Sequence, residues 1–420
     1  SSNADANGIG TFEYAPPTDY VCLCTSSLEN TTIGPEQSDQ PTDHFNTAIW
    51  SGNSTNNRSI TTDHATDFIW IKKRTTTVQN HVIADSVRGT SDNGGTGNVR
   101  ILAANSAAIE STNQSDSGIA SFDSDGFTLG AGSNTANADA PYQGINASNH
   151  TYVGWSWKAG GAPTADNSAG VGATPTAGSV KIDGSNLGSA LAGSIAATRL
   201  SANTKAGFSI IEWVGNQTNS TLAHGLNSTP EMVIVKNLDY GSANWYTWHK
   251  DINTDKVLFL NATNSETTSA NAFVEGDMAA TTIGLGTERV TNGSSEEMLA
   301  FVWHSVEGYS KIGSYVPYST SDSHFVYCGF RPAWVMIKRT TGATRSWAIY
   351  DNKRGTFNEI TNPLAADLTS TEPFSTEQDI DFVSNGFNLP ADASTHTVTA
   401  DVRFIFMAFA EAPFKFANAR

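Results

Sequence analysis

The chain has 420 residues, of which 38% are hydrophobic and 15% charged, and its formal net charge is −17. Lysine and arginine form no run longer than three residues, which argues against a nucleic-acid partner and against an anionic membrane surface. No apolar stretch approaches the roughly 18 residues of a membrane-spanning helix, so membrane insertion is not expected. Low charge together with 10% aromatic residues predicts an all-β protein of about two to four domains.

Strand and turn patterns divide the chain into five parts. These are an N-terminal arm with a strand that packs on the first sandwich, a first repeat, a Gly/Ala/Ser-rich linker, a second repeat and a third repeat, at 1–44, 45–158, 159–206, 207–305 and 306–420. Within the linker, residues 185–205 are expected to hold a short helix. The second and third repeats follow each other directly, so we expect them to pack as one rigid body.

A pair of strands joined by a polar loop is the clearest repeated feature. It occurs at 67–89, again at 333–355 and more weakly at 231–249. In each copy, 13 residues separate a lysine from the polar residue that ends the second strand. That residue is Asp85 in the first copy, Asp351 in the third and His249 in the second.

Two further blocks recur after the strand pair. The segments 121–129 and 381–389 place Asp-Gly or Asn-Gly between apolar residues, which is a strong hairpin signal. Aromatic strands at 152–157, 298–303 and 404–409 close the repeats. Short strands separated by turns, within units of about 100 residues, predict tandem β-sandwiches, and a jelly roll is favoured because no Cys…Trp…Cys pattern appears.

The same motifs carry a resemblance to a known group of proteins. The patterns apolar-Trp-apolar-Lys, apolar-x-Asp-x-x-Arg-Gly, Phe-x-Ser-Asp/Asn-Gly-Phe-x-Leu and Tyr-Val-x-Trp-x-Trp-Lys-Ala-Gly-Gly resemble repeats in virion proteins of marine bacteriophages that infect cyanobacteria and SAR11-type bacteria. The resemblance covers about 45–160 and 207–420 and includes His224-Gly225-Leu226…Pro230. It is weaker in the second repeat, where His249 replaces the aspartate and no Arg-Gly follows.

The resemblance implies concanavalin A-like (laminin G/SPRY-like) jelly-roll sandwiches on the exterior of a phage particle. It implies other virion proteins as partners and, by analogy with fibre proteins, a homotrimer. A host-surface glycan is a further candidate partner. The implied function is that of a tail fibre or spike component that presents lectin-like domains for attachment.

The most repeated polar residues admit two interpretations. Lys72, Asp85 and Arg88, with their counterparts Lys338, Asp351 and Arg354, could form a ligand site with two cations and a carboxylate. We favour structural ion pairs that fix the turn after the second strand, because half-buried Asp–Arg pairs hold geometry.

Aromatic residues of the second repeat are candidates for glycan stacking. These are Trp245 and Trp248 in the strand, and Tyr240 in the loop before it. Trp245 and Trp347 each stand nine residues after the repeated lysine, which favours a role in the core or between domains. Tyr240 is therefore the better exposed candidate.

Acidic residues give weaker signals. Glu377, Asp379 and Asp381 alternate onto one strand face, as the paired carboxyls of a polysaccharide hydrolase require, but they occur in one repeat only. Asp123 with Asp125, or Asp139, are candidate calcium ligands, although calcium takes six to eight oxygens. No histidine or cysteine spacing indicates zinc, and Cys22, Cys24 and Cys328 are expected to be small hydrophobic residues rather than a disulfide framework. We expect no catalytic site, no metal and no cofactor.

The sequence therefore favours a non-enzymatic tail fibre or spike component. The alternatives are a capsid-decorating or head-fibre protein without a receptor role, and a polysaccharide depolymerase. Functional contacts are expected in the loops that differ between copies, at 89–105, 238–244 and 342–345.

Overall fold

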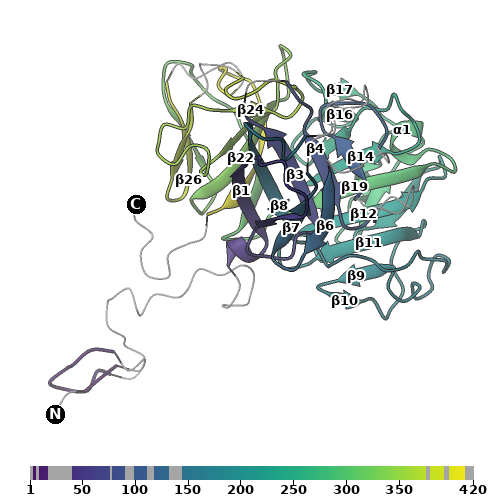
Figure 1. Cartoon of the computed structure of the whole chain (residues 1–420), viewed down its shortest axis with the longest axis horizontal. Helices are drawn as coiled ribbons and strands as arrows, with labels where there is room; N and C mark the ends of the chain where they lie inside the picture. The colour runs from purple at the N-terminus through teal and green to yellow at the C-terminus, as the bar shows by residue number, and fades with distance from the viewer. Residues whose placement is uncertain are drawn as a thin grey trace.

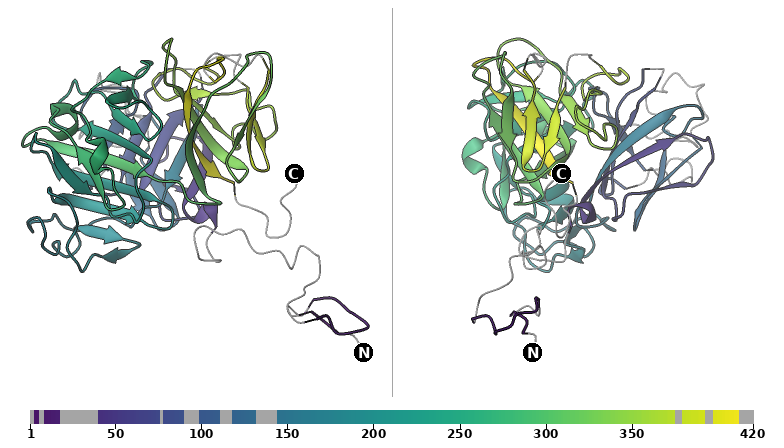
Figure 2. Two further views of the ribbon diagram at one scale, coloured as in Figure 1. Left: turned by 180° about the vertical axis from the view of Figure 1, so that it is seen from behind. Right: turned by 90° about the vertical axis from the view of Figure 1, so that its left-hand side faces the viewer.

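The computed structural model describes residues 3–5, 9–17, 40–75, 78–89, 99–110, 118–131, 144–374, 379–391 and 397–411. These residues form β-sheets with almost no helix, which confirms the predicted all-β sandwich class (Figure 1). Each of three repeats pairs a large sheet with a small one. The views in Figures 1 and 2 show the repeats as three lobes of one body.

Repeat 1 has a large sheet in the order β1-β8-β3-β4-β5 and a small sheet in the order β2-β7-β6. Its strands are β1 (Phe45–Ser51), β2 (Arg58–Thr61), β3 (Phe68–Lys73), β4 (Val82–Asp85), β5 (Ile101–Ala103), β6 (Ile119–Asp123), β7 (Gly126–Leu129) and β8 (Thr151–Trp157). The predicted hairpin joins β6 to β7. Its glycine permits close approach, because a Cβ on Gly126 would lie 2.0 Å from the Ile60 carbonyl oxygen of β2.

Repeat 3 has the same strand order, with sheets β20-β27-β22-β23-β24 and β21-β26-β25. Its strands are β20 (Ser310–Tyr315), β21 (His324–Tyr327), β22 (Pro332–Arg339), β23 (Ala348–Asp351), β24 (Leu364–Ala365), β25 (Asp381–Val383), β26 (Gly386–Leu389) and β27 (Phe404–Ala410). The first and third repeats are thus copies of one sandwich, as their shared motifs predict.

Repeat 2 is larger, with a nine-stranded sheet in the order β10-β9-β11-β12-β19-β14-β15-β16-β17 and a small sheet β13-β18. The strands are β9 (Val180–Ile182), β10 (Ser185–Asn186), β11 (Ala197–Asn203), β12 (Phe208–Val214), β13 (Ser220–Ala223), β14 (Met232–Asn237), β15 (Tyr246–His249), β16 (Lys256–Phe259), β17 (Thr267–Thr268), β18 (Thr282–Leu285) and β19 (Glu297–Trp303). A short helix α1 (Arg289–Asn292) precedes β19.

The segment predicted as a linker, 159–206, supplies β9, β10 and β11, three of the four strands by which this sheet exceeds those of repeats 1 and 3. β11 pairs with β12 along its length, and β9 pairs in parallel with β11. The expected helix in 185–205 is wrong, because Leu200 and Ala202 enter the sandwich core from β11 with the two-residue period of a strand. A composition rich in small residues concealed this strand, since its apolar side chains are few.

The central strands are buried on both faces. Every residue of β3, β14 and β22 is buried except Ala333. In β3, Ile69 and Ile71 enter the core of their own sandwich, whereas Phe68 and Trp70 enter a core that all three repeats share. The protein therefore has three sandwich cores and a fourth between the sandwiches, and continuous apolar strands are the sequence pattern of that burial.

Aromatic rings fill the shared core. Phe45 and Trp157 of repeat 1 pack against Phe409 of repeat 3, with ring centroids 4.9 and 5.4 Å from it. Phe68 of repeat 1 packs on Phe301 of repeat 2, at 4.6 Å. These contacts make the repeats one packed body rather than separate domains on a string.

The N-terminal arm is described at 3–5 and 9–17, where Asn3 and Phe12 pair with each other. Both figures draw this hairpin apart from the sandwiches. The part of the predicted strand beyond residue 17, with Cys22 and Cys24, lies outside the described residues. In the described part of the chain, no helix has the length and apolar character to span a membrane.

Candidate functional site

The repeated lysines join the repeats in a ring. Each buried ammonium donates to the carbonyl seven residues further on, and to a carbonyl of a neighbouring repeat. Lys72 of repeat 1 reaches Thr369 of repeat 3 at 2.8 Å. Lys236 of repeat 2 reaches Ala107 of repeat 1, and Lys338 of repeat 3 reaches Thr263 of repeat 2, both at 2.9 Å.

The three accepting carbonyls occupy equivalent places. Each belongs to the fourth residue after the strand β5, β16 or β24, and these strands hold the same position in the three large sheets. The contacts therefore run from repeat 1 to 3, from 3 to 2 and from 2 to 1. We call these lysine contacts and the residues around them the joints.

A second set of side chains follows the same direction. Trp245 donates its indole hydrogen to the Ala103 carbonyl at 3.0 Å, and Trp347 donates to the Phe259 carbonyl at 2.9 Å. His81 stands at the equivalent position of repeat 1, against the backbone of Ala365, which completes the set. The spacing of nine residues after the lysine predicted this role between domains for Trp245 and Trp347.

Two aspartates cap the turn after the second strand. Asp85 accepts from the backbone amides of Val87 and Arg88 at 3.1 and 3.0 Å, and from Arg88 Nε at 2.6 Å. Asp351 and Arg354 repeat the Nε contact at 2.6 Å, and all four side chains are excluded from solvent. These are the ion pairs that the repeated motif predicts.

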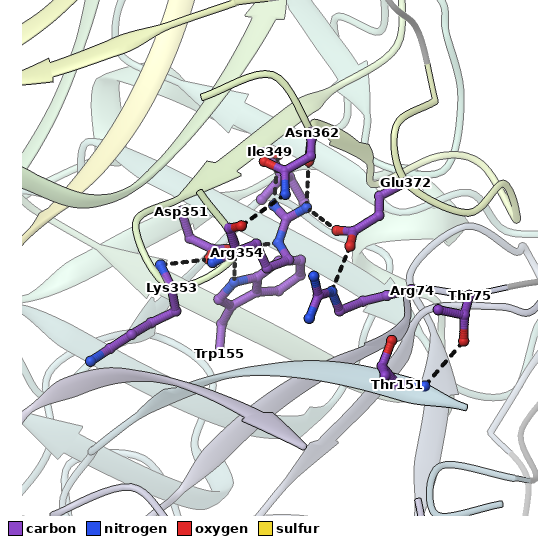
Figure 3. A network of polar contacts seen from close by, with 10 residues as sticks. All are labelled: Arg74, Thr75, Thr151, Trp155, Ile349, Asp351, Lys353, Arg354, Asn362 and Glu372. Atoms are coloured by element: carbon purple, nitrogen blue, oxygen red, sulfur yellow. Dashed lines mark hydrogen bonds and ion pairs between the residues drawn. The ribbon is translucent and has the colours of Figure 1, made fainter. Parts of the chain in front are cut away.

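In repeat 3 the ion pair extends across a joint (Figure 3). Glu372 binds Arg354 of its own repeat at 2.8 Å and Arg74 of repeat 1 at 2.6 Å. Trp155 of repeat 1 donates to Asp351 Oδ2 at 3.0 Å. The buried charges of repeat 3 are thus satisfied partly by repeat 1, which ties the two sandwiches together.

The prediction of ion pairs for Lys72 and Lys338 is wrong. Within the described chain, both ammonium groups donate to backbone carbonyls and neither pairs with a carboxylate. Burial lowers the pKa of Lys72 to about 7 and that of Lys338 to about 7, because the charged form loses its hydration. An ammonium with three donors suits carbonyls that converge from two loops.

Repeat 2 departs from the pattern as its sequence indicates. His249 takes the place of the aspartate and its Nδ1 accepts from the Asp251 amide at 3.1 Å. Burial lowers the pKa of His249 to about 3, so the neutral ring caps this turn. Glu212 of β12 brings a carboxyl toward Arg88 of repeat 1, and burial raises the pKa of Glu212 to about 7.

The structure does not support glycan stacking by Trp245 and Trp248. Trp245 is fully buried in the shared core, and Trp248 is 7% exposed in the core of repeat 2. Tyr240 is half-buried, and the Arg289 guanidinium covers its ring at 4.0 Å from the centroid. The candidate rings of repeat 2 are thus occupied by the protein itself.

The loops expected to carry function form the joints instead. Ala243 and Arg345 supply carbonyls to Lys236 and Lys338, and the Arg345 amide donates to the Thr263 carbonyl at 2.9 Å. The segment 89–105 contains β5, a fully buried strand. Each of these joints contains a loop of one repeat and a different loop of the neighbouring repeat, which accounts for their different sequences.

Repeat 3 carries exposed aromatic residues that were not among the candidates predicted from the sequence. Phe325 and Tyr327 of β21 are 51% and 64% exposed, whereas the alternate residues of the strand, His324 and Val326, are buried. The sequence does hold a sign of this surface. The outward residues of β21 are aromatic, whereas repeat 1 has the polar residues Ser59 and Thr61 at the matching positions.

The acidic candidates also have structural partners. Both oxygens of Asp123 accept hydroxyl hydrogen bonds, from Ser121 at 2.8 Å and from Thr128 at 2.7 Å. Across the described ranges, no group of three or more potential metal-binding side chains occurs. Asp381 begins β25 and Asp379 precedes that strand, and both are half-buried, while Glu377 and Asp139 lie outside the described residues.

Comparison with known proteins gives a family without an assigned activity. Neither the curated proteins nor the solved structures gave a match to the chain. One family model, described as a domain of unknown function (DUF7483), matches twice, at 40–184 and at 181–413. The first match covers repeat 1, and the second begins at β9 and covers repeats 2 and 3. Because these matches span most of its length, the chain belongs to the DUF7483 family.

Proposed function

We propose that the chain is a structural component of a bacteriophage particle, a tail fibre or spike protein that presents its sandwiches to the host surface without catalysing a reaction. The observation that carries the proposal is the ring of joints. The repeated motif residues, which in an enzyme would converge on a substrate, are used instead to hold one sandwich against the next. This use fits a rigid particle component.

The distribution of exposed groups also supports an attachment role. The strands that the repeats share are buried, while their small sheets carry different outward side chains. A constant scaffold with a variable surface is the arrangement that recognition proteins use. The sequence motifs resemble those of marine phage virion proteins, which supports a place in a phage particle.

Immunogold labelling of intact phage particles with antibodies against the purified chain tests this proposal. We expect gold at the tail extremity, and we expect purified chain to reduce adsorption of the same particles to host cells. Labelling of the head would favour a decoration protein and would contradict the attachment role. Particles without label would overturn the virion assignment.

A further inference from the structure

The outer face of the small sheet in repeat 3 has the composition of a binding surface. β21 is an edge strand of the sheet β21-β26-β25, whose middle strand β26 is labelled in Figure 1. Its outward residues Phe325 and Tyr327 are mostly exposed, and Tyr318, at 71% exposure, packs on the ring of the adjacent His324. Side chains two apart on a strand are separated by about 7 Å. The pair therefore forms an aromatic platform.

Glycines beside the platform give its rings room to lie along the sheet. Phe325 Cε2 lies 3.1 Å from the position that a Cβ on Gly386 would occupy. The Tyr327 hydroxyl lies 3.5 Å from the corresponding position on Gly329. The rings thus lie beside glycines, where no neighbouring side chain crowds them.

A row of polar side chains continues from the platform across the sheet. Phe325 is paired with Asn388, and Asn388 is paired with Asp381 of the next strand, so the three side chains share the outer face. Asp381 Oδ1 is shielded from solvent and has no hydrogen-bond partner among the described residues. Asp381 and Asn388 therefore place polar groups on the same face as the aromatic platform.

We propose that this face binds a neutral polysaccharide of equatorially linked pyranose units, with Phe325 and Tyr327 stacking on sugar rings and Asn388 and Asp381 accepting or donating hydrogen bonds to hydroxyl groups. Equatorial pyranoses expose flat C–H faces that pack on aromatic rings, while their hydroxyls lie at the rim. The inference rests on the proposed attachment function and gives it a site and a ligand class.

Area and charge favour a glycan over other ligands. Three aromatic side chains of about 150–250 Å² each, exposed by half to two-thirds, offer roughly 300–450 Å². A stable protein interface needs about 800 Å² from each partner. The carboxylate of Asp381 within the site, and a net charge of −17 on the chain, disfavour acidic polysaccharides.

The other repeats lack this surface. At the positions of Phe325 and Tyr327, repeat 1 has Ser59 and Thr61, and repeat 2 has Thr221 and Ala223. In repeat 2, Gly193 and Ile195 also pair along the edge of β13. Among the small sheets that the structure describes, only that of repeat 3 carries this surface, and repeat 1 offers a matched control on the same strand of an equivalent sheet.

Titration calorimetry of the full chain with cellohexaose and with chitohexaose tests the inference. We expect binding to at least one of them, and at least tenfold weaker binding in the variant Phe325→Ala/Tyr327→Ala. Asp381→Asn should weaken binding several-fold. The control Ser59→Ala/Thr61→Ala should bind as the parent chain does, and all variants should show the parent circular dichroism spectrum, because the substituted side chains lie at the surface.

Several outcomes would overturn the inference. These are equal affinity in the aromatic variant, binding to neither neutral hexamer, preference for an oligouronate, or release of reducing ends. A change in oligomeric state on Phe325→Ala/Tyr327→Ala, measured by sedimentation, would assign the face to a second copy of the chain instead. Glycan binding by a chain that is absent from the particles would leave the site intact and refute only the virion proposal.

Discussion

The buried lysines at the joints are the residues whose protonation bears most directly on the assembly of the repeats. Each ammonium is removed from water and bonded to carbonyls of two loops. A neutral amine still donates two hydrogen bonds to two carbonyls, so a joint survives loss of the charge. What changes with pH is the cost of burying the group.

Lys72 should therefore make stability rise with pH. Burial lowers its pKa in the folded chain to about 7, from the usual lysine value of 10.5. Between these values the unfolded chain binds a proton that the folded chain does not, so the free energy of unfolding increases with pH across that window. The unfolding free energy of the parent minus that of Lys72→Met should rise with pH, with a slope approaching about 1.4 kcal/mol per pH unit.

Urea unfolding of both proteins at several values between about pH 7 and about pH 9.5 measures this slope. Lys256→Met, at a partly exposed lysine that donates to Thr268, provides the control for removal of a lysine outside the joints. If the difference in unfolding free energy between the parent and Lys72→Met does not change with pH, Lys72 keeps its charge in the folded chain throughout this range.

The buried pair Asp85–Arg88 should depend on both partners. Repeat 2 has His249 and Ile252 at these positions, so the replacement can be copied from the chain itself. Asp85→His alone leaves the Arg88 guanidinium without its main partner and should cost about 3–5 kcal/mol. Asp85→His/Arg88→Ile should cost less than Asp85→His alone, as measured by urea unfolding, because no unpaired charge remains. A larger loss in the double variant would contradict this account.

At the scale of elements, the strand β11 shows how a segment of small residues can be essential. It pairs with β12, which corresponds to the edge strands β1 and β20 of repeats 1 and 3, and so extends the large sheet of repeat 2 beyond that edge. Gly160 lies against it, and a Cβ there would approach the carbonyl oxygens of Ala202 and Lys181 to 2.5 Å. Glycine is thus required by close backbone packing.

Gly160→Val should separate β9 from β11 and destabilise repeat 2 by about 1–3 kcal/mol, the usual cost of overpacking. The matched control is Gly170→Val, since Gly170 is exposed and a Cβ there meets nothing within 4 Å. Thermal unfolding monitored by circular dichroism compares the two variants with the parent. Equal midpoints for Gly160→Val and Gly170→Val would mean that β9 and β11 tolerate the separation.

The elements differed in how far the sequence predicted them. Hairpins and central strands were predicted because two-residue alternation and continuous apolar runs are local patterns, as at 121–129 and in β3. β11 was missed because its burial comes from pairing with β12, a contact that composition does not encode. The joints were missed for a related reason, since a lysine gives no local sign of which distant carbonyl it binds. The aromatic platform was predictable, because β21 has Phe-x-Tyr where the matching strand β2 of repeat 1 has Ser-x-Thr.

At the scale of the whole molecule, the shared core decides how the chain unfolds. Its residues come from all three repeats, including Trp157, Trp303 and Phe409. Removing any repeat would expose the apolar faces of the other two large sheets. The free energy of each sandwich is therefore coupled to the presence of its neighbours.

We expect the chain to unfold in one cooperative transition. Tryptophan fluorescence, which reports the shared core, and far-ultraviolet circular dichroism, which reports all sheets, should give coincident urea curves. Calorimetry should give a van't Hoff enthalpy close to the calorimetric one. Two separated transitions would show instead that at least one sandwich is stable on its own.

In terms of symmetry, the contact that passes from each repeat to the next is a heterologous interface whose rotation closes after three units. Closure gives each of the three lysines its receiving carbonyl within one chain. Among the described residues, the joints are thus paired with one another and not with a second molecule. A homotrimer or any larger assembly must therefore use other parts of the chain, such as the outward small sheets or the edge strands β1 and β20, and would multiply the single aromatic face into an array with higher avidity.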